Sequence, residues 1–201
     1  SAMMERANLA LKKTLQLPQH LKKIGVYDEK EHQKLEREKH LEMRMEQALK
    51  NGEFVPYLQP KYELTHETIA GAEALVRWVS PEEGMIFPGE FIPLFEKNGF
   101  IVELDLYMFE QVCKMIESWH KNGYRIIPVS VNMSRGHFLV PNFFDRYKEI
   151  LERYDVPKGS IEIELTESLF LNEISTMTDL VNKIHEVGLR CSIDDFGSGY
   201  S

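Results

Sequence analysis

Strand-like and helix-like segments alternate from Gly52 to the end of this 201-residue chain. Hydrophobic patterning predicts strands over 54–58, 69–78, 127–133, 161–165 and 190–194, and helices over 91–98, 104–122, 142–154 and 178–187. Repeated strand–helix units place successive strands side by side in a parallel sheet, either doubly wound or closed into a (β/α) barrel. With 43% hydrophobic residues, the chain is long enough to bury one substantial core.

Three consecutive strand patterns carry polar side chains on one face only. A period of two residues places Glu73 and Arg77 on the same face of the 69–78 strand, opposite alanine, valine and tryptophan. The same alternation separates Asn132 and Glu164 from their apolar neighbours. An antiparallel surface sheet would also show a polar face, but the intervening helices argue against one. We therefore predict a barrel whose interior is polar near its mouth.

Five acidic or amide side chains stand at the ends of predicted strands: Glu73, Asn132, Glu164, Asp194 and Asp195. Clustered carboxylates are costly to bury unless a positive charge lies among them, and oxygen clusters are what hard divalent cations bind. The set contains no cysteine or histidine, which favours Mg²⁺ or Mn²⁺ over Zn²⁺. The sequence therefore predicts a metal site.

Each of these residues also has a simpler interpretation when it is considered alone. Glu73 and Arg77 could form an ion pair that lines a barrel, and Asn132 could be a core or turn amide. Glu164 could be an ordinary acid at a strand end, and Asp194–Asp195 could be a plain turn. Coincidence becomes a weak explanation when all of them occur at successive strand ends.

Five short runs of sequence occur in a fixed order along the second part of the chain. They are Tyr57-Leu58-Gln59-Pro60, Glu73-Ala74-Leu75-Val76-Arg77-Trp78, Ser130-Val131-Asn132-Met133-Ser134, Glu164-Leu165-Thr166-Glu167-Ser168 and Asp194-Asp195-Phe196-Gly197-Ser198-Gly199-Tyr200-Ser201. Together they resemble the motifs of EAL-domain cyclic di-GMP phosphodiesterases. A single Glu-Ala-Leu has almost no specificity, whereas five ordered motifs from Glu53 to Ser201 are specific.

The resemblance implies an α/β fold, a modified (β/α)₈ TIM-type barrel, of which this chain holds about the first five strands. It implies hydrolysis of cyclic di-GMP to linear pGpG with two Mg²⁺ or Mn²⁺ ions. By matching position, the metal ligands would be Glu73, Asn132, Glu164, Asp194 and Asp195, of which Glu73, Asp194 and Asp195 are assigned as catalytic. Gln59 and Arg77 would contact the substrate, and Glu167 would steady the loop that follows the aspartates.

The residues before the barrel divide into two segments. Residues 1–27 have a weaker resemblance to the last helix and strand of a GGDEF domain, so we expect an upstream GGDEF or sensory domain in the parent protein. Residues 28–51 are dense in charged residues with apolar positions at helical spacing, which predicts a connecting helix. Residues 52–201 are assigned as the N-terminal part of an EAL domain.

The chain stops at Ser201, whereas a complete (β/α)₈ barrel typically takes ~250 residues. The later lysine, glutamate and glutamine-containing motif of the family have no counterpart here, so we expect this fragment to lack turnover. An unclosed parallel sheet exposes unpaired backbone groups. We therefore expect closure by further chain or by a homodimer.

Two alternative functions remain open. One is a catalytically degenerate EAL module that binds cyclic di-GMP or a protein partner without cleavage. The other is an interaction segment in which the 28–51 helix pairs chains through Leu41, Met45 and Leu49.

Composition excludes several other classes. The net charge is −8 and no stripe of basic residues alternates with aromatic ones, so DNA or RNA is not an expected partner. Cys113 and Cys191 lack a CxxC spacing, and we interpret both as reduced core residues. No apolar run approaches the ~18 residues of a membrane span, which predicts a cytoplasmic location, with any anchor elsewhere in the parent.

Overall fold

The computed structural model describes residues 28–65, 67–166 and 174–194, together with the isolated residues 4 and 11. Of Thr166, 174–177 and Asp194 it describes only the backbone. The chain divides into two compact units, Ser1–Met45 and Glu46–Ser201. Among the described helices, none combines the length and the apolar character that a membrane span requires.

The predicted helix over 28–51 is present as α2 (Glu29–Lys50). The Asp28 carboxylate accepts a hydrogen bond from the Lys30 backbone N–H at 2.9 Å, which satisfies one of the unpaired donors of the first turn. The helix ends before Gly52, whose φ of 72° is a left-handed conformation that favours glycine. The role of this helix as a connector stays a prediction.

The second unit contains one mixed sheet, whose strands in the described residues are β1 (Phe54–Glu63), β2 (Thr68–Ser80), β3 (Gly84–Ile86), β4 (Val129–Met133), β5 (Ile161–Thr166) and β6 (Arg190–Asp194). Their order is β1-β2-β4-β5-β6, with β3 paired to β2. The pairs β2–β4, β4–β5 and β5–β6 are parallel. The helices are α3 (Pro88–Asn98), α4 (Ile101–Lys121), the 3₁₀ helix η2 (Arg135–Leu139), α5 (Phe143–Leu151) and α6 (Ile174–Glu186).

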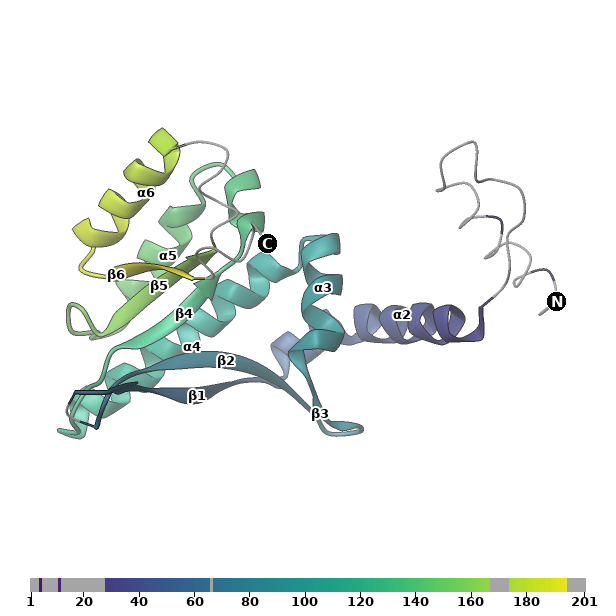
Figure 1. The fold of residues 1–201 in the computed structure, drawn as a ribbon, viewed down its shortest axis with the longest axis horizontal. Helices are drawn as coiled ribbons and strands as arrows, with labels where there is room; N and C mark the ends of the chain where they lie inside the picture. Colours follow the sequence, from purple (N-terminus) through teal and green to yellow (C-terminus); the bar gives the residue numbers. More distant parts are fainter. Residues whose placement is uncertain (1–3, 5–10, 12–27, 66, 167–173, 195–201) are drawn as a thin grey trace. The chain divides into compact units, whose positions relative to one another are not determined.

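The core lies between the sheet and the helices that cover one of its faces. Helix α4 packs against β1, β2 and β4 and runs behind the sheet in Figure 1, while α6 packs against β6. The alternate residues of β4 and β5 that were predicted to be apolar are all buried at 3% exposure or less: Val129, Val131, Met133, Ile161, Ile163 and Leu165. The predicted separation of an apolar and a polar face is therefore confirmed in these two strands.

The α/β prediction is confirmed, and the described sheet is open, as expected for part of a barrel. One expectation was wrong, because β1 pairs with β2 in the antiparallel direction. The connection between these strands is too short for the crossover that parallel neighbours need, so they form a hairpin. The short elements β3 and η2 were not predicted, since three to five residues carry little periodic pattern.

Candidate functional site

Strand register brings three of the predicted ligands onto one face of the sheet. Glu73 of β2 lies opposite Ser130 of β4, and Asn132 of β4 lies opposite Glu164 of β5. The Asn132 side chain donates a hydrogen bond from Nδ2 to Oε1 of Glu73 at 3.0 Å. Because side chains alternate along a strand, Glu73, Asn132 and Glu164 all lie on the face opposite the helix-covered core.

Glu164 is the most buried of these three residues, and its carboxylate has a cationic partner. Its side chain is 7% exposed and contacts the ammonium group of Lys61, which extends from β1 and is 44% exposed. Desolvation lowers the pKa of Lys61, but the hydrogen bond and charge of Glu164, with the charges of Glu162 and Glu73, outweigh it and raise that pKa. This face of the sheet therefore holds a cation among three carboxylates.

The predicted substrate-binding residues, Gln59 and Arg77, belong to the β1–β2 hairpin. Gln59 lies opposite Glu73 in the antiparallel register and is exposed to solvent. The guanidinium carbon of Arg77 lies 5.9 Å from the centroid of the Tyr57 ring, and Nη1 donates to the Val76 carbonyl at 2.8 Å. These contacts hold the planar donor group of Arg77 on the same face as Glu73.

The remaining predicted residues are described only in part. The backbone of Asp194 pairs in register with Thr166, at the C-terminal ends of β6 and β5. The Asp194 side chain, all of Asp195 and all of Glu167 lie outside the described residues. The structure therefore leaves their predicted roles untested.

The described donors fit a hard divalent cation in their chemistry but do not by themselves form a complete cluster. In residues 28–65, 67–166 and 174–194, no three acidic, histidine or cysteine side chains approach closely enough to hold an ion. Two carboxylates and one amide, Glu73, Glu164 and Asn132, nevertheless share one face, and oxygen donors of this kind suit Mg²⁺ or Mn²⁺. The Glu164 carboxylate is paired with the Lys61 ammonium group, so one of these oxygen donors already has a cationic partner.

Sequence reasoning missed a buried network that supports the end of β4. One Asp105 oxygen, Oδ2, accepts a hydrogen bond from the Ser134 backbone N–H at 2.8 Å and lies 3.1 Å from Nε2 of His137. The Tyr147 hydroxyl also lies 3.1 Å from that nitrogen. Because a carboxylate only accepts hydrogen bonds, Nε2 of His137 is the donor in its contact with Asp105. Ser134 follows Asn132 by two residues, so Asp105 anchors the turn beside the candidate site.

The sequence contains one indication of this network. Asp105 is an acidic residue on the face of α4 that also presents the buried residues Ile101 and Phe109, four positions away in each direction. An acid on the apolar face of a helix needs a partner. The identity of that partner depends on tertiary structure, and His137 is one of its two hydrogen-bonding partners.

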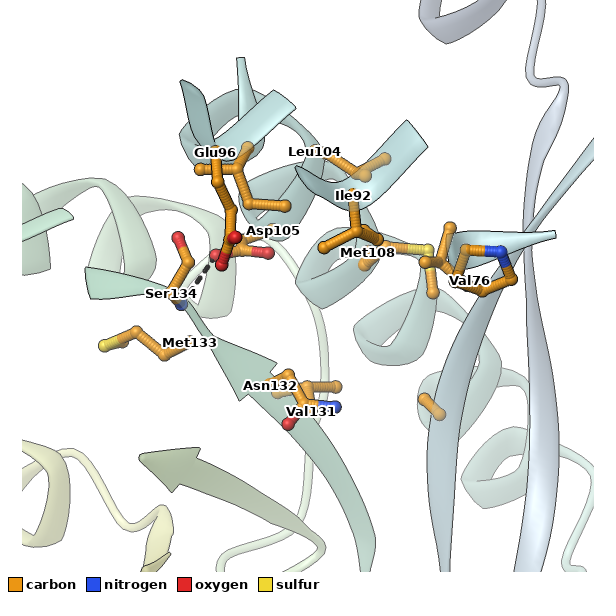
Figure 2. A pocket seen from close by; sticks show the side chains of 13 residues that line it. Val76, Ile92, Glu96, Leu104, Asp105, Met108, Val131, Asn132, Met133 and Ser134 are labelled. Carbon is orange, nitrogen blue, oxygen red and sulfur yellow. Dashed lines mark hydrogen bonds between the residues drawn. The ribbon is translucent and has the colours of Figure 1, made fainter. Parts of the chain in front are cut away.

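A cavity of about 240 Å³ lies on the helix side of β2 and β4, where the two strands separate (Figure 2). Its walls are mainly aliphatic side chains from α3, α4 and the two strands. Figure 2 shows the Asp105 carboxylate and Ser134 together at one side of this cavity, joined by their hydrogen bond. Residues 131–134, at the end of β4, also form part of the cavity wall.

Comparison with known proteins identifies the same family as the sequence motifs do. Residues 42–201 match the profile of the EAL domain. The Bacillus subtilis signaling protein YkoW is 34% identical over 160 residues, which cover 80% of this chain and 20% of that protein. MucR of Pseudomonas aeruginosa, a bifunctional diguanylate cyclase/cyclic di-GMP phosphodiesterase, is 32% identical over 157 residues, which cover 78% of this chain and 23% of MucR. The chain thus spans less than a quarter of the length of either protein.

A solved structure shares the fold. The PaMucR phosphodiesterase in complex with c-di-GMP matches with a TM-score of 0.73 and 31% sequence identity. The match covers 81% of this chain and 66% of that chain.

Proposed function

This chain belongs to the EAL domain family, and from that premise we propose that the protein containing it hydrolyses cyclic di-GMP to linear pGpG. The observation that carries the proposal is the shared face of Glu73, Asn132 and Glu164, three motif residues from three neighbouring strands. The hydrogen bond between Asn132 and Glu73 supports it, because it brings two predicted ligands together across a strand boundary.

We propose that Glu73, Asn132 and Glu164, with Asp194 and Asp195, hold two Mg²⁺ or Mn²⁺ ions. When bound, such ions supply an activated water and neutralise the charge that gathers on the phosphate oxygens. In the hydrolysis, the water oxygen bonds to phosphorus, the bond from phosphorus to a 3′ oxygen breaks, and that oxygen takes a proton. The protein's own contribution is to fix the carboxylates on one rigid sheet, which limits their movement.

Arg77 and Gln59 are proposed to position the dinucleotide. Arg77 lies four residues from Glu73 on the same face of β2, a separation of ~13 Å along the strand. Its guanidinium group is already oriented by Tyr57 and by the Val76 carbonyl, so a phosphate can bind its planar donors with little loss of side-chain freedom. Gln59, opposite Glu73, can donate an amide hydrogen bond to the same ligand.

The test is hydrolysis of cyclic di-GMP by the full-length protein with Mn²⁺, followed as pGpG by chromatography. Glu73→Gln is expected to reduce the rate by more than about a hundredfold. This is a larger loss than the removal of a residue that only hydrogen-bonds to a metal ligand would cause. Glu149→Gln, an exposed site on α5, is the control and is expected to keep the rate. The 201-residue chain, predicted to be inactive, is measured in parallel.

Two results would contradict the proposal. The first is a folded full-length protein with Mn²⁺ that binds cyclic di-GMP but leaves it intact, which would favour the receptor alternative. The second is a Glu73→Gln variant as active as the Glu149→Gln control.

A further inference from the structure

The ion pair between Lys61 and Glu164 joins strands that are not neighbours. In the sheet order, β2 and β4 lie between β1, which carries Lys61, and β5, which carries Glu164. Side chains stand roughly perpendicular to a sheet, so the two groups can meet only because the sheet curves around the polar face. The contact therefore crosses the concave side of the partial barrel.

The Lys61 ammonium group lies on the face of the sheet that carries Glu73, Glu162 and Glu164. It contacts Glu164 directly and interacts electrostatically with Glu162 and Glu73. Glu164 is almost fully buried, and a buried carboxylate without a positive partner is strongly unfavourable. Lys61 thus supplies the positive charge that this carboxylate needs in the folded protein.

Two of these carboxylates, Glu73 and Glu164, are the residues to which the proposed function assigns divalent ions. An ammonium group on a flexible four-carbon stem can withdraw from a carboxylate, and at 44% exposure the Lys61 side chain has solvent to withdraw into. A divalent ion cannot share the Glu164 oxygen with Lys61 without repulsion between two close positive charges.

We propose that Lys61 is a positioning residue that competes with the metal for Glu164. Its ammonium group holds the carboxylate in place on the polar face and must leave Oε1 when a divalent ion binds there. Lys61 therefore lowers the affinity of the site for metal while it stabilises the site in the metal-free protein. The inference rests on the proposed function for the identity of the ions, and it adds a residue outside the predicted ligand set.

The experiment compares Mn²⁺ binding at one fixed pH, measured by calorimetry or by loss of the free-ion EPR signal, in full-length protein variants. Lys61→Met keeps most of the apolar stem and removes the charge. We expect this variant to bind Mn²⁺ about tenfold more tightly, which corresponds to the lower end of what a hydrogen bond to a charged group contributes. Lys61→Arg keeps the charge and is expected to stay within about threefold of the unmodified protein. Lys114→Met is the matched control, because Lys114 is 48% exposed and pairs with Glu110 on α4.

Thermal unfolding in EDTA gives a second readout that does not depend on activity. Lys61→Met is expected to unfold at a lower temperature than Lys114→Met, and Mn²⁺ should remove that difference. Lys61→Gln keeps a hydrogen-bond donor for Glu164 and replaces Lys61→Met in these experiments if Lys61→Met does not fold. Lys61→Gln is also expected to bind Mn²⁺ more tightly than the unmodified protein.

The proposal is overturned if Lys61→Met and Lys61→Gln bind Mn²⁺ with unchanged or weaker affinity, or if neither they nor the unmodified protein binds it. Tighter binding by these variants, in a protein that does not cleave cyclic di-GMP, would support the role of Lys61 and reject the proposed activity. The two proposals can therefore fail separately.

Discussion

Replacement of Asp105 by alanine tests how strongly the buried network supports the end of β4. The Asp105 side chain is 11% exposed, and one of its oxygens accepts hydrogen bonds from the Ser134 backbone and from His137. A hydrogen bond to a charged group contributes about 1.5–3 kcal/mol, and its loss leaves a buried donor unpaired. We expect Asp105→Ala to lower the free energy of unfolding by at least about 3 kcal/mol, which is twice the lower end of that range because two such bonds are lost. For a chain of this size that is a fall of about 6–12 °C in Tm.

The assay is thermal and urea unfolding followed by circular dichroism. Asp105→Asn keeps one acceptor for Ser134 but loses the charge, so we expect a smaller loss of about 1–2 kcal/mol. Glu96→Ala is the control, because Glu96 lines the same cavity but is exposed, and its change should stay within about 0.5 kcal/mol. A Tm for Asp105→Ala within error of the Glu96→Ala value would refute the reasoning.

Two further predictions concern packing and thiol chemistry. A Cβ atom at Gly71 would lie 2.9 Å from the Pro128 carbonyl oxygen, so Gly71→Ala should destabilise the protein by about 1–3 kcal/mol in urea unfolding. Gly89 is the control, because a Cβ atom there would point into open space, and Gly89→Ala should leave stability unchanged or raise it by up to about 1 kcal/mol. Equal losses of stability in both variants would be inconsistent with the Gly71–Pro128 contact. Burial raises the pKa of Cys113 to about 12 and that of Cys191 to about 11, so both thiols should stay protonated and react slowly with DTNB at pH 8 until the protein is unfolded. Rapid modification of the native protein would contradict this.

Local patterns in the sequence were sufficient to predict the main strands and their faces. In β4 and β5, the alternation of apolar and polar residues correctly predicts which face of the strand packs against the helices. Each apolar position in these strands is buried. The same alternation correctly grouped Asn132 with Glu164, since residues in register on parallel neighbours share a face. The direction of β1 was missed because the alternation of strands and helices was extended to this strand, although its connection to β2 is too short for a crossover.

Contacts between distant strands could not be predicted in the same way. In the sequence, Lys61 is one charged residue in a polar stretch, and nothing nearby indicates its partner. Its contact with Glu164 depends on how far the sheet curves. The partner of Asp105 likewise depends on where η2 places His137 after the end of β4. Both are electrostatic contacts between elements far apart in the chain, for which local periodicity carries no information.

The most direct test of the account is a crystal structure of the full-length protein grown with Mn²⁺, with diffraction data collected at the manganese absorption edge. We expect two anomalous peaks on the polar face, within coordination distance of the side chains of Glu73, Asn132 and Glu164, with the Lys61 ammonium group displaced from Glu164. An anomalous map without peaks at this face, with Lys61 still bound to Glu164 at saturating Mn²⁺, would contradict the account.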